Sequence, residues 1–144
     1  MLLETEFPFN PMSKSNSKNI LFQIEIADDR TIAAVQSEFH AQFQYLKIEF
    51  FKAPHKIGEA SAKNLIYGSS RYIRECRINR NASLLDISES MTVNELEGAF
   101  STQFGLSVQV FRKSGNVWLE TSATDGWSLK QQNDEGAELS SQIK

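Results

Sequence analysis

Two stretches of the chain repeat the same order of hydrophobic and polar positions. Residues 31–52 (TIAAVQSEFHAQFQYLKIEFFK) and 92–113 (TVNELEGAFSTQFGLSVQVFRK) match at one offset (92 − 31 = 61), with one residue skipped after Phe43. The matched hydrophobic residues are Ile32, Val35, Phe39, Phe43, Leu46, Ile48, Phe50 and Phe51 in the first stretch and Val93, Leu96, Phe100, Phe104, Leu106, Val108, Val110 and Phe111 in the second. The repeat predicts two copies of one structural unit.

Each stretch opens with a predicted helix. Its apolar residues recur at spacings of three and four, which places them on one narrow stripe. Thr31 and Thr92 are predicted N-caps, because a threonine hydroxyl accepts from a backbone N–H of the first turn, and Glu95 adds a capping box. Gly105 predicts the end of the second helix. Gly98, inside that helix, costs about 1 kcal/mol relative to alanine, and the pattern gives no reason for it.

Strands are predicted where apolar and polar residues alternate, at residues 19–27, 45–52, 83–88 and 106–112. A turn at 113–116 and a fifth strand at 117–121 predict a hairpin. Short helices are predicted at 71–78 and 125–133. Each copy therefore reads as strand, helix, strand, loop and short helix.

The predicted domain is a single α+β unit at residues 19–133, with the repeat divided into 19–82 and 83–133. Prolines, serines and asparagines without a period predict a flexible arm at 1–18, and residues 134–144 read as a polar tail. Two strand–helix–strand units that share one sheet favour a ferredoxin-like two-layer sandwich, with one mainly antiparallel sheet and both helices on one face. The alternative is two β-grasp-like halves packed together.

The opposite face of this sheet is where a binding surface is expected. Its outward residues are Gln23, Glu25, Lys47, Glu49, Phe51, Leu84, Asp86, Ser107, Gln109 and Phe111. One interpretation is partial cover by the short helices and by residues 53–82. The other is a face for a second copy or for another protein. The three carboxylates on the face disfavour RNA, because they repel phosphates.

The composition limits which classes of protein the chain can belong to. The 144 residues fit one domain, and 40% hydrophobic against 23% charged residues support a core. A net charge of −3 argues against a general nucleic-acid binder. No apolar run is long enough to span a membrane, and the N-terminus has no pattern of a secretory signal. The single Cys76 favours a reducing compartment, so the cytoplasm is expected.

The residue types that serve in catalysis or metal binding do not occur at the spacings of known motifs. His40 lies on the first helix and His55 in a loop, and neither has a second ligand at a metal-binding spacing. Cys76 reads as a small buried hydrophobe. No phosphate-binding glycine loop or dinucleotide motif is present. We therefore predict no catalytic residue, no metal and no cofactor, and we lean against an enzyme.

Two tryptophans have two readings. Trp118, on the hairpin, and Trp127, at the last short helix, either close the core or form the aromatic wall of a groove flanked by Arg112 and Lys113. Gln42 and Gln103 occupy equal places in the two copies, and each is predicted to satisfy a backbone group where helix and sheet meet.

The segments PHKIGEASAKN, RYIRECR and FGLSVQVFRKSGNVWLETSATDGWSLKQQN resemble a small bacterial protein family for which no activity is known. The likeness runs from about residue 19 to residue 136. It implies a stand-alone protein and adds no site residue.

The favoured function is a non-enzymatic protein-interaction or self-associating module, and its partner is a second copy or an unidentified protein, with no nucleic acid and no membrane. The predicted binding surface consists of Phe51, Gln109, Phe111, Arg112, Trp118 and Trp127. The alternative is a small-molecule-binding protein or enzyme with a pocket near Trp118, Trp127 and His55.

Overall fold

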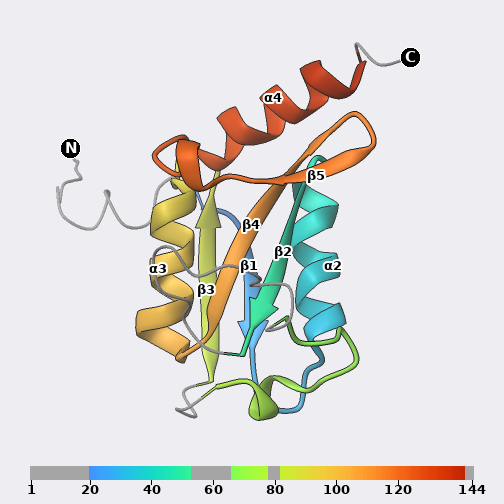
Figure 1. Ribbon diagram of the computed structural model, residues 1–144. Helices are drawn as coiled ribbons and strands as arrows, with labels where there is room; N and C mark the ends of the chain where they lie inside the picture. Colours follow the sequence, from blue (N-terminus) through green and yellow to red (C-terminus); the bar gives the residue numbers. More distant parts are fainter. Residues whose placement is uncertain (1–19, 53–65, 78–81, 142–144) are drawn as a thin grey trace, which may run out of the picture.

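The computed structural model describes residues 20–52, 66–77 and 82–141 (Figure 1). The predicted arm at 1–18, His55 and the last three residues of the predicted tail lie outside this part of the chain. The elements are β1 (Ile20–Ile26), α2 (Ile32–Gln42), β2 (Leu46–Phe51), η3 (Ile73–Glu75), β3 (Ser83–Ser88), α3 (Val93–Phe104), β4 (Ser107–Ser114), β5 (Val117–Glu120), η4 (Ser122–Thr124) and α4 (Leu129–Ser141). The chain is therefore an α+β protein, as predicted.

The strands form two antiparallel sheets, and this corrects the prediction of one. β1 pairs with β3, and a separate sheet has the order β2-β4-β5. This pairing is not that of a ferredoxin-like sandwich with a single sheet. Neither half has a sheet of its own, as a β-grasp-like half would, because β1 and β2 lie in different sheets. Alternation predicts which face of a strand is buried but not which strand lies beside it.

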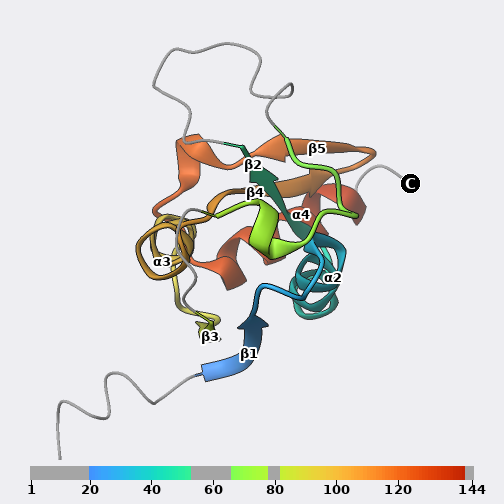
Figure 2. The ribbon, with the colours of Figure 1, turned by 90° about the horizontal axis from the view of Figure 1, so that it is seen from below.

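α2 packs against β2 and α3 packs against β4, so both helices contact the same three-stranded sheet. Figure 2 shows the β1–β3 pair opposite the β2–β4–β5 sheet, with α2 on one flank and α3 on the other. Both apolar stripes point into the same core, and Phe39 and Phe100 have no exposed surface. The phenylalanine rings pack edge to face or tilted, with Phe50 and Phe100 at 5.7 Å between ring centroids.

The predicted helix ends are confirmed. The Thr31 hydroxyl accepts from the N–H of Ala34 at 3.2 Å. Thr92 and Glu95 form the capping box, with backbone-to-side-chain distances of 3.0 and 3.1 Å. Gly105 follows α3 in the left-handed region with φ of 66°, a conformation that costs glycine little.

The last helix is longer than predicted. Residues 134–141, which read as a polar tail, continue α4 across the end of the molecule (Figure 1). Its buried residues are Leu129, Gln132 and Gly136, so only one of the three is a hydrophobic side chain. A Cβ at Gly136 would lie 2.7 Å from Cβ of Tyr45, which shows how closely α4 approaches the start of β2. The sequence pattern predicts the first part of this helix but not its continuation over residues 134–141, where the buried residue is Gly136.

The two halves bring a later segment to the start of their helix through matching backbone hydrogen bonds. The N–H to C=O pairs of the first half are Ile32 to Arg71, Ala33 to Ser69, Ile73 to Arg30 and Arg74 to Asp28. Those of the second half are Val93 to Trp127, Asn94 to Asp125, Leu129 to Met91 and Lys130 to Glu89. The residues near the helix start are offset by 61 (93 − 32) and those of the later segment by 56 (127 − 71). The two halves therefore share one connection scheme, with five residues fewer in between in the second half.

Candidate functional site

An aromatic and basic cluster lies on the outer face of the β2–β4–β5 sheet. The register places Lys47 opposite Phe111 and Lys113 opposite Trp118, so that all four side chains share one face. The Lys47 ammonium lies 5.6 Å from the ring centroid of Phe111 and 5.0 Å from that of Trp118. The Lys113 ammonium lies 6.0 Å from the Trp118 ring. Cation–π attraction therefore holds both lysines over the aromatic side chains.

The charges of this cluster are compensated on the same face. Glu49 pairs with Lys47 at 3.1 Å, and Glu120 stands opposite Phe111 in the register. Two lysines and two glutamates give the face no net charge. The cluster therefore has no excess of charge for a strongly ionic partner.

A cleft of about 340 Å³ adjoins the cluster between α2 and the edge of β2, and Trp118, His40, Lys47 and Ser69 are among its lining residues. His40 Nδ1 lies 2.8 Å from the carbonyl oxygen of Leu46. A carbonyl oxygen only accepts, so Nδ1 carries the proton, and Nε2 of the neutral ring is left as an acceptor. The imidazole meets the indole of Trp118 edge-on at 6.3 Å between ring centroids.

Three outward carbonyls on the β2 edge of this sheet accept hydrogen bonds from the same chain. The carbonyl of Leu46 accepts from His40, and that of Ile48 accepts from Gln36 Nε2 at 2.8 Å. The carbonyl of Phe50 accepts from the N–H of Tyr67 at 2.8 Å. Three successive outward carbonyls of β2 thus have partners, which leaves no row of acceptors for another strand.

The stretch of β4 that precedes its pairing with β5 also has partners within the chain. The N–H of Val110 donates to a carboxylate oxygen of Glu97 at 3.0 Å, and its carbonyl accepts from the Thr121 hydroxyl at 2.9 Å. Burial raises the pKa of Glu97 to about 7, against the favourable Val110 bond and together with repulsion from Asp125 and Glu120. The contact between Glu97 of α3 and Val110 of β4 therefore contains a carboxyl group whose pKa lies near neutral pH.

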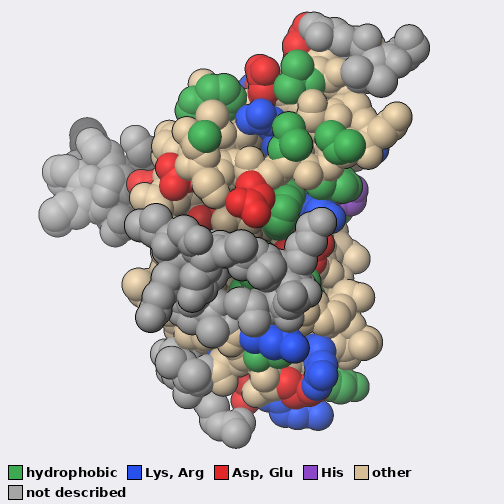
Figure 3. All heavy atoms as spheres, in the orientation of Figure 1, with side chains coloured by type: hydrophobic (Ala, Val, Ile, Leu, Met, Phe, Trp, Pro, Cys, Tyr) green, Lys and Arg blue, Asp and Glu red, His purple; other side chains and the backbone are tan. Residues whose placement is uncertain are grey.

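The β5 edge differs from both. The two-residue turn makes Ser114 and Val117 the closing pair of the hairpin, so the N–H and C=O groups of Trp118 and Glu120 point away from β4. Among the described residues no hydrogen bond reaches these groups. Val117 is 55% exposed and Leu119 43% exposed on the other side of the strand. Figure 3 shows hydrophobic side chains gathered over the upper part of the molecule, where β5 and α4 lie.

The structure brings four of the six residues predicted as a binding surface together as two separate pairs, Phe111 with Trp118 and Arg112 with Trp127. Phe111 and Trp118 are half-buried and share the Lys47 ammonium. Phe51 and Gln109 belong to the same face of the sheet, but they are only 3% and 7% exposed, which corrects their prediction as outward contact residues. Gln109 instead donates to the carbonyl of Val110 at 3.1 Å.

Arg112 and Trp127 lie on the other face, because Arg112 and Lys113 are successive residues of one strand. The Arg112 guanidinium lies 5.7 Å from the ring centroid of Trp127 and donates to Gln132 Oε1 at 2.7 Å. The fully buried Gln132 amide donates in turn to the carbonyl and hydroxyl of Thr124, at 2.7 and 2.9 Å. This network attaches α4 to β4. The predicted pocket near Trp118, Trp127 and His55 is not assembled from the two tryptophans, and His55 lies outside the described residues.

Cys76 is buried, as predicted, at the end of η3. Burial raises the pKa of its thiol to about 11, so it is not a reactive thiolate at neutral pH. Among the described residues no group of three or more His, Cys, Asp or Glu could hold a metal ion. No helix in this part of the chain has the length and apolar character needed to cross a membrane.

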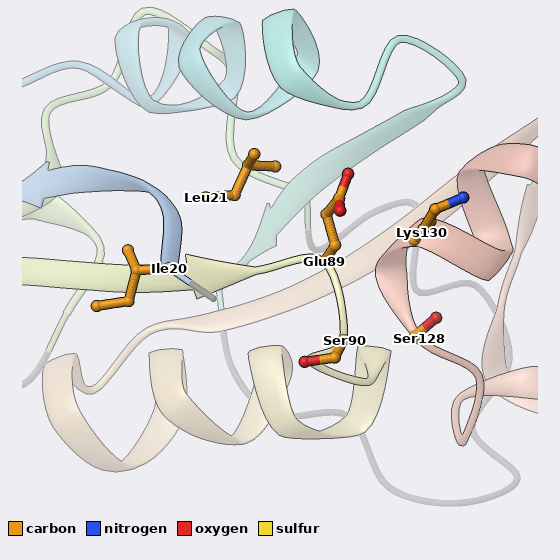
Figure 4. Close-up of a pocket in the computed structure, with 6 residues that line it drawn as sticks. All are labelled: Ile20, Leu21, Glu89, Ser90, Ser128 and Lys130. Carbon is orange, nitrogen blue, oxygen red and sulfur yellow. The ribbon is translucent and has the colours of Figure 1, made fainter. Parts of the chain in front are cut away.

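A second hollow lies near the start of β1. It has a volume of about 560 Å³ and is lined by Ile20, Leu21, Glu89, Ser90, Ser128 and Lys130. Figure 4 shows apolar groups from β1 on one side and, on the other, polar groups from the segment before α3, from Ser128 and from the first turn of α4. None of the described residues that were predicted as a site lines it.

The sequence reasoning placed Lys47 on the outward face of the sheet but left it out of the predicted binding surface, and it missed His40, Gln36 and Glu97 as members of the site. Gln42 and Gln103, the amides predicted to meet the sheet, are exposed. A signal for the correct pair was present: Gln36 and Glu97 occupy the same place in the two copies (97 − 36 = 61), four residues after the first apolar residue of each stripe. Hydrogen-bonding side chains at the border of both stripes indicate contact with the strand edge.

Comparison of the chain with models of protein families, with curated proteins and with solved structures finds no match. No family or function is assigned from these comparisons.

Proposed function

We propose that the protein is a non-enzymatic protein-interaction module that adds an extended segment of polypeptide to the free edge of β5. The observation that carries this proposal is the contrast between the two edges of one sheet. Side chains and backbone from the same chain occupy the outward carbonyls of β2, whereas the outward groups of Trp118 and Glu120 have no partner among the described residues. Strand addition uses such groups for affinity.

The side chains of β5 suit an added strand. Val117 and Leu119 offer exposed apolar surface on one side of the strand, and Trp118 offers a half-buried indole on the other. An extended segment lying beside β5 would contact both sets, because its own side chains alternate. The balanced charges of Lys47, Glu49, Lys113 and Glu120 favour a segment of mixed or no net charge.

The test is a titration of isotopically labelled protein with short extended peptides in which valine alternates with threonine, lysine or glutamate. We expect the amide signals of Trp118 and Glu120 to shift and their hydrogen exchange to slow by at least about tenfold, because each gains a hydrogen bond. The amides of Ile48 and Phe50, at the β2 edge, are expected to stay unchanged.

Glu120→Pro and Glu120→Ala form a matched pair of variants. Proline removes the outward N–H, whereas alanine keeps it and removes the same carboxylate. Peptide binding should be lost in the first and retained in the second. Equal behaviour of the two variants, or peptides that leave Trp118 and Glu120 unmoved, would contradict the proposal.

A second candidate function is the binding of a small neutral molecule in the cleft beside Trp118. The cleft supports it through an indole wall, the His40 ring and compensated charges. Nicotinamide and adenosine are suitable planar neutral probes. In a Trp127→Phe background they should quench the fluorescence of Trp118, and His40→Ala should abolish the quenching while Ser101→Ala leaves it intact. Unchanged fluorescence at saturating probe would exclude this function for planar neutral ligands.

We also propose that the two halves arose by internal duplication. The support is the set of four backbone hydrogen bonds that recurs at constant offsets of 61 and 56 residues, together with the equal positions of Gln36 and Glu97. Related sequences provide the test: a chain containing one half that assembles as a dimer with the same four hydrogen bonds would strengthen the proposal, and relatives in which only one half keeps the stripe would weaken it.

A cytoplasmic location remains our proposal for the compartment. The buried thiol of Cys76, the sole cysteine of the chain, supports a reducing environment because it forms no disulfide. Cell fractionation tests it, and recovery with the secreted proteins would contradict it.

A further inference from the structure

We infer that the segment received by β5 is β5 of a second copy of this chain, paired antiparallel about a two-fold axis through Leu119. This inference rests on the proposed function and names its partner. A two-fold interface uses the same patch twice, so the patch must be complementary to itself. The strand meets this condition in its backbone, its apolar side and its charged side.

Only one register of the two β5 strands uses all the outward N–H and C=O groups of Trp118 and Glu120. With the axis at Leu119, Trp118 of one copy lies opposite Glu120 of the other. Their N–H and C=O groups both point outward, so each such pair exchanges two hydrogen bonds, and the two pairs make four. Leu119 faces its own copy as a non-hydrogen-bonded pair, because its backbone groups are used by Arg112.

The apolar side of the strand gains cover in this register. Leu119 packs against Leu119 of the second copy, and a Val117 flanks the pair at each end. Val117, 55% exposed, and Leu119, 43% exposed, are two of the exposed large hydrophobic side chains in the described part of the chain. Their pairing would remove a continuous apolar row from water.

The outer side is complementary in charge. Glu120 of one copy would lie beside Trp118 of the other, and the lysine ammonium groups at 5.0 and 6.0 Å from that ring belong to Lys47 and Lys113. Each carboxylate thus meets a tryptophan that already carries positive charge over its ring. The same contact occurs twice, once on each side of the axis.

The register is tested by cysteine cross-linking of the full chain. Cys76→Ser removes the single native thiol, and Leu119→Cys or Val117→Cys then places one new thiol on β5. A non-hydrogen-bonded antiparallel pair has a Cα separation of about 4.5 Å, within the range of a disulfide. Two Val117 positions are four residues out of register, about 13 Å apart along the strands, and outside that range.

We expect mild oxidation to double the mass of the Leu119→Cys protein and to leave the Val117→Cys protein a monomer. Light scattering of the unmodified protein should show a monomer–dimer equilibrium. It should shift fully to monomer in Glu120→Pro, whereas Glu120→Ala, which keeps the outward N–H but loses the carboxylate contact with Trp118, should still dimerise, with weaker association. Circular dichroism of each variant confirms that it folds.

Two results would overturn the inference: a strict monomer at all concentrations with no cross-link at 119, or equal cross-linking at 117 and 119. The proposed function is judged separately. If the protein is a monomer and added peptides still slow exchange at Trp118 and Glu120, only the identity of the partner fails. If neither a second copy nor a peptide protects those amides, both fail.

Discussion

Gln36 on α2 and Glu97 on α3 stand at the same place in the two halves, and each joins its helix to the edge of a strand. Gln36 donates to the carbonyl of Ile48 at 2.8 Å, whereas Glu97 accepts from the N–H of Val110 at 3.0 Å. An amide satisfies a carbonyl and a carboxylate satisfies an N–H. The difference teaches that equal positions in a repeat keep their geometric role while the chemistry matches the backbone group that the strand presents.

The two halves can also be compared through the phenylalanine that each helix buries in the shared core. The largest effects on stability are expected there. Phe39→Ala and Phe100→Ala should each lower the free energy of unfolding by about 3–5 kcal/mol, because each removes a fully buried ring from one core. Urea denaturation measures both. Similar losses would show that the halves support the core equally, whereas a loss under about 1 kcal/mol in either would break the comparison. Ser101→Ala, at an exposed position of α3, serves as the control.

The halves differ most in the segments that come after the shared connection. From Ile73 the first half forms a single 3-10 turn, η3. From Leu129 the second half forms α4, a helix of thirteen residues. The last turns of α4 return to the hairpin, where the N–H of Gly115 donates to the Ser140 hydroxyl at 3.2 Å. Gly136 makes this return possible by its close approach to Tyr45.

Gly136→Ala should therefore destabilise the protein by about 1–3 kcal/mol, because the new methyl group would overlap Cβ of Tyr45 and crowd Lys113 and Arg112. The matched control is Gly98→Ala, also inside a helix, where nothing lies within 4 Å of the new Cβ. That change should stabilise the protein by about 0.5–1 kcal/mol through helix propensity. Urea denaturation measures both, and the same sign for the two variants would contradict the packing argument.

The success of the sequence reasoning depends on which interactions are local. The stripes of α2 and α3, the Thr31 and Thr92 caps and the Gly105 stop were predictable, because each depends on residues within about one or two turns. The pairing of β1 with β3 was not, because alternation is blind to the neighbouring strand. The continuation of α4 beyond residue 133 was not predicted either, because its buried residue is Gly136, which packs through bare backbone instead of a hydrophobic side chain.

The same division holds for the candidate site. Phe111 and Trp118 were selected as large aromatic residues on a predicted strand, which needs only local information. Lys47 joins them through the β2–β4 register, and His40 joins them through the packing of α2 on the β2 edge. Phe51 was expected outside and is buried, because alternation assigns a side to a residue but not the cover over that side.

The last predicted effect is a dependence of stability on pH. It distinguishes the Glu97–Val110 contact from the Gln36–Ile48 contact. The pKa of Glu97 is raised to about 7 in the folded protein from an ordinary value of 4.5. Between about pH 4.5 and 7 the folded state therefore holds a proton that the unfolded state has lost. The stability associated with this proton is present in full below pH 4.5 and is lost as the pH rises through 7. Partial exposure of the carboxyl group reduces the loss to about 1–2 kcal/mol.

Glu97→Gln should remove this loss, because an amide oxygen still accepts from Val110 and carries no charge. Unfolding in urea at pH 5 and at pH 8 measures the effect: the variant should match the parent protein at pH 5 and exceed it by about 1–2 kcal/mol at pH 8. The reciprocal Gln36→Glu should acquire a loss of stability with rising pH, because a carboxylate there faces Glu49, whose oxygen lies 3.2 Å from the present amide nitrogen. If the stability of Glu97→Gln depends on pH as strongly as that of the parent protein, the titrating group lies elsewhere. The Gln36–Ile48 and Glu97–Val110 contacts then differ in geometry alone.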